Sequence, residues 1–198
     1  MVKLDAVNYL LGILGSSPVG ALSNPNPDVQ TAVDALDAAI ISVTSKGYWF
    51  NEVYNVYLTP DPITNKIDTT AYTKVITRSE YAVIRGDYLF SPHRNSYEFT
   101  VPVRMDGVAL LDFDDLPDIV QQAVQFYAGV QLCTVELEDS TKRSEMKELY
   151  SLAFVQMKEE ELEIKRINRQ TSPRVAAARR RVSPARLNSS TGPNFGGR

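Results

Sequence analysis

Few residues of this chain could carry out nucleophilic or acid–base chemistry. Its 198 residues include one histidine and one cysteine. A Ser–His–Asp or Cys–His arrangement would have to use His93, which Pro92 and Arg94 place in a turn far from any nucleophile motif. Cys133 falls on the apolar seam of an expected helix, where a cysteine acts as a small buried hydrophobic residue. These two residues are too few to hold zinc, so we expect no metal and no cofactor.

Carboxylates are the remaining catalytic candidates. Four aspartates gather where a β-rich stretch gives way to a helix: Asp112, Asp114, Asp115 and Asp118. Two suitably spaced acids are enough for a glycosidase. Asp114 or Asp115 can instead cap the helix that follows, because the positive end of a helix favours carboxylates. We therefore expect a structural role for this group and no catalytic residues.

Apolar residues at three- and four-residue spacing predict four helices. The first covers residues 4–14, and the second begins at Pro27 with Asn26 as its N-cap and Gly47 past its end. The third carries one inward seam: Ile119, Ala123, Phe126, Val130, Cys133 and Leu137. The fourth follows a turn near 138–141, and we expect Glu161 and the other acids of residues 159–163 to form its solvated face.

The part of the sequence between the second and third helices is rich in Tyr, Val, Ile, Thr and Phe. These residues predict five strand segments: 52–59, 72–78, 81–90, 96–104 and 107–113. Turn-forming residues interrupt them, among them Arg85-Gly86-Asp87 and Asp106-Gly107. Segment 96–104 alternates apolar and polar residues, as a half-buried strand does. An antiparallel β region of this size is expected to pack on the helices.

These elements predict an α+β fold, mainly helical, in which a small antiparallel β domain is inserted into a four-helix bundle. The expected parts are the bundle (1–50 and 115–170), the β domain (51–114) and an extended basic C-terminal arm (171–198). The aromatic run Tyr48-Trp49-Phe50 could form a stacking platform for sugars or bases, but core packing is the commoner use of such a run. We therefore assign four residues to packing of the bundle and β domain: Trp49, Phe50, Phe126 and Tyr127.

Charge is divided sharply along the chain, whose formal net charge is −3. Residues 1–164 hold all 24 acids and 12 of the 21 Lys and Arg, a charge of −12, whereas residues 165–198 hold nine bases and no acid. Such a tail can bind nucleic acid, stay solvated, or dock on an acidic protein surface. Apolar residues spaced between its arginines favour a protein partner, as does the repulsion between DNA and an acidic body.

Nothing in the sequence predicts a membrane anchor or a secretion signal. Asp5 interrupts what would be the apolar region of a signal peptide, and the first 15 residues predict an amphipathic helix instead. The longest apolar run, near residues 38–43, is too short to span a bilayer. A single cysteine permits no intrachain disulfide and favours a reducing compartment. We expect synthesis as a soluble protein of the cytoplasm.

Four stretches of the chain resemble the tail tubular protein A family, the head-to-tail adaptors of short-tailed bacteriophages. They are VNYLLGILGSSPV (7–19), SKGYWFN (45–51), YAVIRGDYLF (81–90) and DFDDLPDIVQQAVQFYAGVQL (112–132). The resemblance covers residues 3–165, and none of its motifs is catalytic. It is therefore a likeness of fold and of element order, and it leaves the arm from residue 171 unmatched.

This resemblance implies a structural subunit of the virion tail. The implied partners are further copies in a ring, a dodecamer in the family, with the phage portal on one side and the tail nozzle protein, tail tubular protein B, on the other. DNA would pass through the lumen without sequence-specific binding. We expect five arginines of the arm to fasten the subunit to the portal: Arg174, Arg179, Arg180, Arg181 and Arg186.

Two other functions are left open by the sequence. The first is the same adaptor with an added polysaccharide-binding or hydrolysing activity in the β domain, since some family members have been credited with such activity. The aspartates of residues 112–118 would then be the first suspects, although no family site residues map onto this chain. The second is a DNA-binding protein acting through the arginine tail, whose affinity for duplex would fall steeply with salt.

Overall fold

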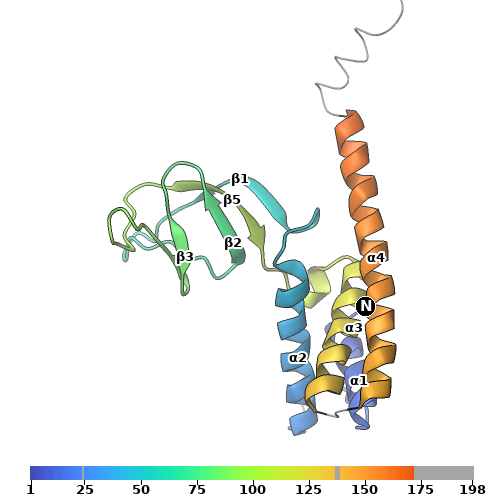
Figure 1. Cartoon of the computed structure of the whole chain (residues 1–198). Helices are drawn as coiled ribbons and strands as arrows, with labels where there is room; N and C mark the ends of the chain where they lie inside the picture. Colours follow the sequence, from blue (N-terminus) through green and yellow to red (C-terminus); the bar gives the residue numbers. More distant parts are fainter. Residues whose placement is uncertain (24, 137–138, 172–198) are drawn as a thin grey trace, which may run out of the picture. The chain divides into compact units, whose positions relative to one another are not determined.

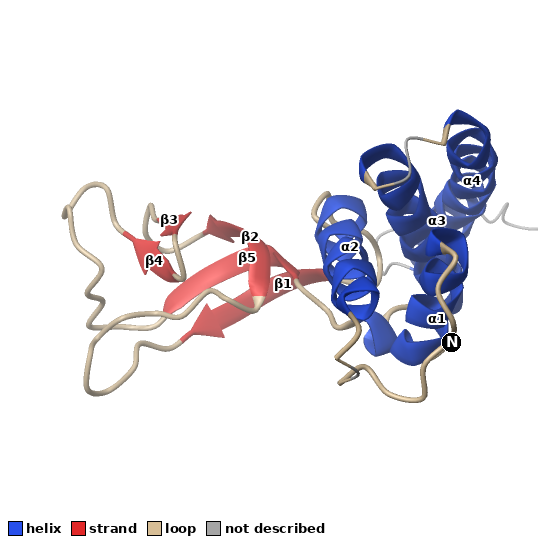
Figure 2. Ribbon diagram, turned by 90° about the horizontal axis from the view of Figure 1, so that it is seen from below, coloured by secondary structure: helices blue, strands red, loops and turns tan. Residues whose placement is uncertain are grey.

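A computed structural model of the chain describes residues 1–23, 25–136 and 139–171. The chain divides into two compact units, Met1–Glu161 and Leu162–Arg198. The described residues contain four α-helices and two small antiparallel sheets, which Figures 1 and 2 show from two sides. The α+β class expected from the sequence is confirmed. All these elements, apart from the end of the last helix, belong to the first unit.

The first two helices, α1 (Lys3–Leu14) and α2 (Pro27–Thr44), lie where the sequence predicts them. The Asn26 side chain accepts a hydrogen bond from the Asp28 amide at 3.0 Å and so caps α2. Gly15 follows α1 with a φ of 82°, the left-handed conformation in which many helices end. Gly47 adopts a φ of 84°, but Ser45 is the C-cap of α2, so the glycine turns the chain three residues beyond the helix.

Helix α3 (Asp118–Val135) follows a single 3-10 turn, η1 (Phe113–Asp115). Its core-facing line lies one to two positions after the predicted seam, because the buried residues at four-residue spacing are Val120, Val124, Ala128 and Leu132. Ala123 and Cys133 are buried as expected, whereas three predicted seam residues are only half-buried: Ile119, Phe126 and Val130. Both α1 and α2 contact α3, so its buried face is wider than one seam. Leu137 lies outside the described residues.

The last helix, α4 (Ser140–Thr171), gives one clear correction. Glu161 was expected on a solvated face, but it is 6% exposed, and its Oε2 lies 2.8 Å from Nζ of Lys158. The reason is helical spacing: Ala153 and Met157, both buried, stand eight and four residues before Glu161 and place it on the inward face. Glu159, Glu160 and Glu163 are exposed, as predicted.

Two separate hydrophobic cores hold the first unit together. The larger lies among the helices, where Leu10, Leu36, Val124 and Met157 contribute one buried side chain from each of α1 to α4. The smaller lies in the β region and is built around Ile67, Leu89, Phe99 and Met105. Figures 1 and 2 show α1, α2 and α3 packed side by side, with the strands outside them.

The main sheet has the strand order β1-β5-β2, with β5 in the centre. Its strands are β1 (Glu52–Leu58), β2 (Tyr72–Thr77) and β5 (Val103–Ala109), and both neighbours run antiparallel to β5. The short strands β3 (Val83–Arg85) and β4 (Tyr88–Phe90) form a hairpin. Gly86 turns this hairpin with a φ of 63°, as the Arg85-Gly86-Asp87 signal predicts.

Two strand predictions are wrong. Segment 96–104 forms only isolated bridges up to Glu98, and its last two residues begin β5. The Asp106-Gly107 pair is not a turn, because it lies inside the central strand. Strand β1 is irregular opposite Asp106, where Asn55 takes a positive φ of 60°, and β2 is irregular opposite the next residues, Val108 and Ala109. Asp106 stabilises this irregular geometry by accepting a hydrogen bond from the Asn55 amide at 2.9 Å.

The Asn55 amide, and then the bound Arg78 guanidinium, hold the pKa of Asp106 below its usual range.

Asn51 joins the helices to the main sheet. Its side chain is 1% exposed and makes three hydrogen bonds: Oδ1 accepts from the Tyr48 amide, and Nδ2 donates to the carbonyls of Thr44 and Ala109. These distances are 2.9, 3.1 and 3.1 Å. The Ala109 amide in turn donates to the Asn51 carbonyl at 2.8 Å. One buried side chain therefore connects the end of α2 with the end of β5.

Candidate functional site

The four aspartates of residues 112–118 are exposed, and two of them contact the start of the chain: Asp114 binds the Lys3 amide and Asp118 lies 3.5 Å from the Met1 amino group. The sequence suggested that Asp114 or Asp115 caps α3, but the N-cap of α3 is Pro117, and no side chain forms a capping hydrogen bond there. Instead, Oδ1 of Asp114 accepts a hydrogen bond of 2.7 Å from the amide of Lys3, the first residue of α1. The cap is formed across 111 positions of sequence, which local spacing does not reveal. The Asp114 carboxylate thus holds the start of α1 beside the 3-10 turn that precedes α3.

The other candidate reactive residues also lie apart from one another. His93 is exposed and makes an edge-on ring contact with Tyr81, with 5.5 Å between centroids. Cys133 is buried as expected, and this burial raises the pKa of its thiol. Within residues 1–23, 25–136 and 139–171, no three potential metal-binding side chains come together. In the same ranges, no α-helix is both long and apolar enough to cross a bilayer.

The aromatic run after α2 is packed against the helical core. Tyr48 is 1% exposed and stacks on Phe50 with 5.9 Å between ring centroids, while Trp49 meets Phe50 edge-on at 5.1 Å. Trp49 and Phe50 are half-buried. Because these three aromatic rings pack against one another, little of their ring surface is exposed for stacking on a ligand.

The other two aromatic residues assigned from the sequence make contacts between helices. Phe126 of α3 meets Tyr9 of α1 edge-on at 6.2 Å, and Tyr127 packs on Tyr150 of α4 at 5.1 Å. Both are half-buried.

Tyr48 carries a hydroxyl group that the core does not satisfy. This hydroxyl is buried and has no hydrogen-bond partner among the described residues. Burial, and then the nearby Glu161 carboxylate, raise the pKa of Tyr48. A buried polar group without a partner is destabilising, so replacing it with hydrogen should help.

We therefore expect Tyr48→Phe to raise the free energy of unfolding by about 1 kcal/mol. Urea denaturation followed by circular dichroism measures this change. Tyr57→Phe is the control, since the Tyr57 side chain is 60% exposed and its hydroxyl is solvated. A loss of stability in Tyr48→Phe would show that the hydroxyl makes a stabilising contact.

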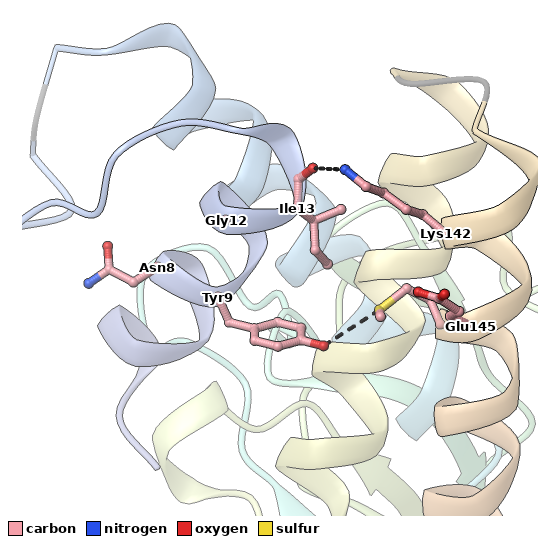
Figure 3. A pocket seen from close by; sticks show the side chains of 7 residues that line it. Asn8, Tyr9, Gly12, Ile13, Lys142 and Glu145 are labelled. Carbon is pink, nitrogen blue, oxygen red and sulfur yellow. Dashed lines mark hydrogen bonds between the residues drawn. The ribbon is translucent and has the colours of Figure 1, made fainter.

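Two open grooves lie between helices. Figure 3 shows the one between α1 and α4, with Tyr9 and Ile13 on one side and Lys142 and Glu145 on the other. Its volume is about 380 Å³, and Met146 also lines it. The Tyr9 hydroxyl lies 3.6 Å from Sδ of Met146, and Lys142 Nζ lies 3.4 Å from the Ile13 carbonyl. The second groove, of about 320 Å³, lies between α2 and the end of α3. Leu132 and Val135 line it beside four polar or charged residues: Thr31, Asp34, Gln131 and Glu136. Both linings mix apolar with polar and charged side chains.

Negative charge is concentrated on the helices. Residues 46–110, which form the β region, hold seven Lys and Arg and seven acids. Residues 1–45 and 111–161 hold five bases and 16 acids, a charge of −11. The acidic body inferred from the sequence is therefore an acidic set of helices attached to a β region of no net charge.

Comparison with known proteins decides the family. The family model described as tail tubular protein matches residues 4–175 of the chain. The chain belongs to the tail tubular protein family. Tail tubular protein A of Klebsiella phage KP34 is 34% identical over 134 residues, which are 67% of this chain and 72% of that protein. Membership of the tail tubular protein family makes this chain a structural component of a phage tail, and the resemblance seen in the sequence is confirmed.

The stretches that carry the tail tubular protein resemblance have structural roles in this chain. SKGYWFN supplies Asn51 and the buried Tyr48, and DFDDLPD supplies Asp114. The sequence analysis did not identify the role of Asn51 in joining the helices to the sheet. The one feature that could have indicated this role is its position directly after three aromatic residues. The five arginines assigned to portal docking lie outside the described residues: Arg174, Arg179, Arg180, Arg181 and Arg186.

Proposed function

We propose that this protein is a head-to-tail adaptor whose copies form a ring between the phage portal and the tail nozzle protein, tail tubular protein B. The match of residues 4–175 to the tail tubular protein family carries this proposal. The side chains that could react support it, because Asp114 caps a helix and Cys133 packs in a core. A ring closes by rotation, and each subunit must then present two different, complementary surfaces.

The same proposal covers the arrangement of the chain. The helices form a four-helix bundle (1–50 and 115–170), the β domain (51–114) is inserted into it, and residues 171–198 extend as an arm. Two separate hydrophobic cores support the division between bundle and β domain. Trp49 and Phe50 pack where the chain passes from one to the other, and Phe126 and Tyr127 pack between bundle helices.

DNA passes through the lumen of the proposed ring without sequence-specific binding. The charge of −11 on the helical residues supports this part, because a wall of carboxylates repels phosphates and so does not hold a moving duplex. The added polysaccharide activity is not proposed. The exposed aspartates of residues 112–118 show no feature that favours it, and Asp114 is already engaged by α1.

The decisive experiment is native mass spectrometry of the purified chain with and without its portal. A discrete ring that binds the portal is the expected result. A chain that stays monomeric and ignores the portal would overturn the proposal.

Removal of residues 172–198 is expected to weaken binding to the portal by about tenfold or more, equivalent to at least 1.4 kcal/mol, because each arginine lost removes a charge-assisted contact. Co-sedimentation with the portal measures the change. A full-length variant with Arg179, Arg180 and Arg181 replaced by glutamine separates charge from length. Portal binding equal to wild type in both variants would exclude the arm from docking.

A further inference from the structure

The outer face of the main sheet carries exposed apolar residues and unpaired cations. Val56, Met105 and Val75 point into the β core, so their neighbours along each strand face outward. Three outward residues are apolar or aromatic and largely exposed: Tyr54 (68%), Tyr57 (60%) and Ile76 (47%). Beside them lie three exposed cations that form no ion pair with another described residue: Lys46, Lys74 and Arg104. We call these six residues the sheet face.

Most of the sheet face borders a shallow hollow. Of the two acids there, Asp106 is paired with Arg78. Glu52 accepts a hydrogen bond of 2.7 Å from the neutral Tyr54 hydroxyl and keeps its charge, so the three cations that form no ion pair with another described residue stand against one carboxylate. The uncompensated charge on this surface is therefore positive, although residues 1–161 as a whole are strongly acidic.

The outer side of α4 carries the reverse combination. Five exposed residues follow one another at steps of three and four, which places them in one line along the helix: Glu145, Glu148, Leu152, Val155 and Glu159. We call this line the α4 stripe. Leu152 and Val155 are 59% and 54% exposed, and the three glutamates form no ion pair with another described residue. Ala153 and Met157 bury the opposite side of the helix in the core.

The sheet face and the α4 stripe match in charge, apolar content and length. The stripe offers two aliphatic side chains between carboxylates, and the sheet face offers two tyrosines and an isoleucine between cations. From Glu145 to Glu159 the stripe extends about 21 Å at 1.5 Å per residue. From Glu52 to Leu58, β1 extends about 20 Å at 3.3 Å per residue. Such surfaces have the apolar centre and charged rim of a protein–protein interface.

We propose that the sheet face of one copy of this chain binds the α4 stripe of the next copy. This inference rests on the proposed ring, to which it assigns the two lateral surfaces. A heterologous contact of this kind leaves a free sheet face at one end of a growing chain and a free stripe at the other, until rotation closes the ring. A nucleic acid fits the sheet face less well, because Tyr57 and Ile76 have no apolar partner on a phosphate backbone.

Charge reversal on each surface tests the contact. The sheet-reversed variant carries Lys74→Glu and Arg104→Glu, and the stripe-reversed variant carries Glu148→Lys and Glu159→Lys. All four positions are exposed, and unchanged thermal melting will verify that each variant folds. Each variant alone is expected to assemble about a hundredfold more weakly than wild type by native mass spectrometry, because like charges then face each other.

Mixing the two variants gives the sharpest result. In an equimolar mixture, each acidic sheet face meets a basic stripe, and each native sheet face meets a native stripe. The mixture is therefore expected to form rings in which the variants alternate. As a control, Arg143→Glu with Lys147→Glu changes the net charge as much as the sheet-reversed variant does, at exposed sites outside both surfaces, and should leave assembly unchanged.

The outcomes separate this inference from the proposed function. Wild-type rings together with unimpaired variants, or impaired variants that mixing does not rescue, would refute the contact while leaving the ring intact. Loss of duplex DNA binding without loss of assembly in the sheet-reversed variant would assign the sheet face to nucleic acid and also refute it. A wild-type chain that forms no ring, alone or with portal, would refute both.

Discussion

Replacing Asn51 with alanine is expected to lower the free energy of unfolding by about 3–5 kcal/mol, since each buried group left without a partner costs about 1–3 kcal/mol. Three groups are affected: the Tyr48 amide and the carbonyls of Thr44 and Ala109. Alanine replaces none of these bonds, and the site is too enclosed for bulk water to do so, since Asn51 is 1% exposed. Urea denaturation followed by tryptophan fluorescence measures the loss.

Asn51→Asp is the matched variant, because it keeps the acceptor for the Tyr48 amide but loses both bonds donated by Nδ2. Burial beside two carbonyl oxygens should raise the folded-state pKa of this new carboxyl above its unfolded value of about 3.9. The stabilising protonated form then prevails below that unfolded pKa, and stability falls as the pH rises through the folded pKa. The stability difference between Asn51→Asp and wild type should therefore shrink as the pH is lowered from 7 towards 4.

A loss of less than 1 kcal/mol in Asn51→Ala would show that this connection between helices and sheet is not essential.

Gly107→Ala is expected to cost about 2–3 kcal/mol, the usual range for forcing atoms into a packed site. A Cβ atom at this position would lie 2.6 Å from the Lys74 carbonyl oxygen and 3.1 Å from Sδ of Met105. The oxygen belongs to the backbone of the neighbouring strand, so the contact is relieved only by moving β2 away from β5. Thermal denaturation of the purified variant checks the loss.

Gly12→Ala provides the control with the opposite sign. Gly12 lies inside α1, and no atom lies within 4 Å of the Cβ it would acquire. Alanine should stabilise the helix by about 0.5–1 kcal/mol through its lower conformational entropy in the unfolded chain. Equal effects of the two substitutions would mean that the close approach of β2 and β5 is not what constrains Gly107.

The sequence predicts the helices of this fold well because their signals are local. Asn26 caps α2 through a neighbour two positions away, and apolar spacing within one segment marks each buried face. Strands depend on partners far along the chain. Asp106-Gly107 has the composition of a turn, yet it lies in the central strand, where β2 pairs with it in register and β1 accommodates an irregularity opposite Asp106. The alternation in 96–104 reflects burial of Phe99 in the β core without a continuous partner strand.

The roles of individual polar residues were also hard to predict from the sequence, because their partners lie far along the chain. Asp114 was expected to cap the helix that follows it, but the helix whose first amide it binds begins 111 residues away. Asn51 bonds to Ala109, 58 positions further on, and nothing near it in sequence announces this partner. Glu161 was misplaced because a run of glutamates suggests a solvated surface, whereas the register set by Met157 turns this one inward.

The β region leaves the helices and returns to them at a single junction. Asn51 and Ala109, at its two ends, exchange hydrogen bonds of 2.8 and 3.1 Å, so the chain enters and exits side by side. A segment whose ends meet imposes little loop-closure entropy on the framework that holds it, whatever its length. The β region is therefore an exchangeable insertion: its strands and loops beyond this junction can lengthen, shorten or change sequence without altering the packing of α2 and α3.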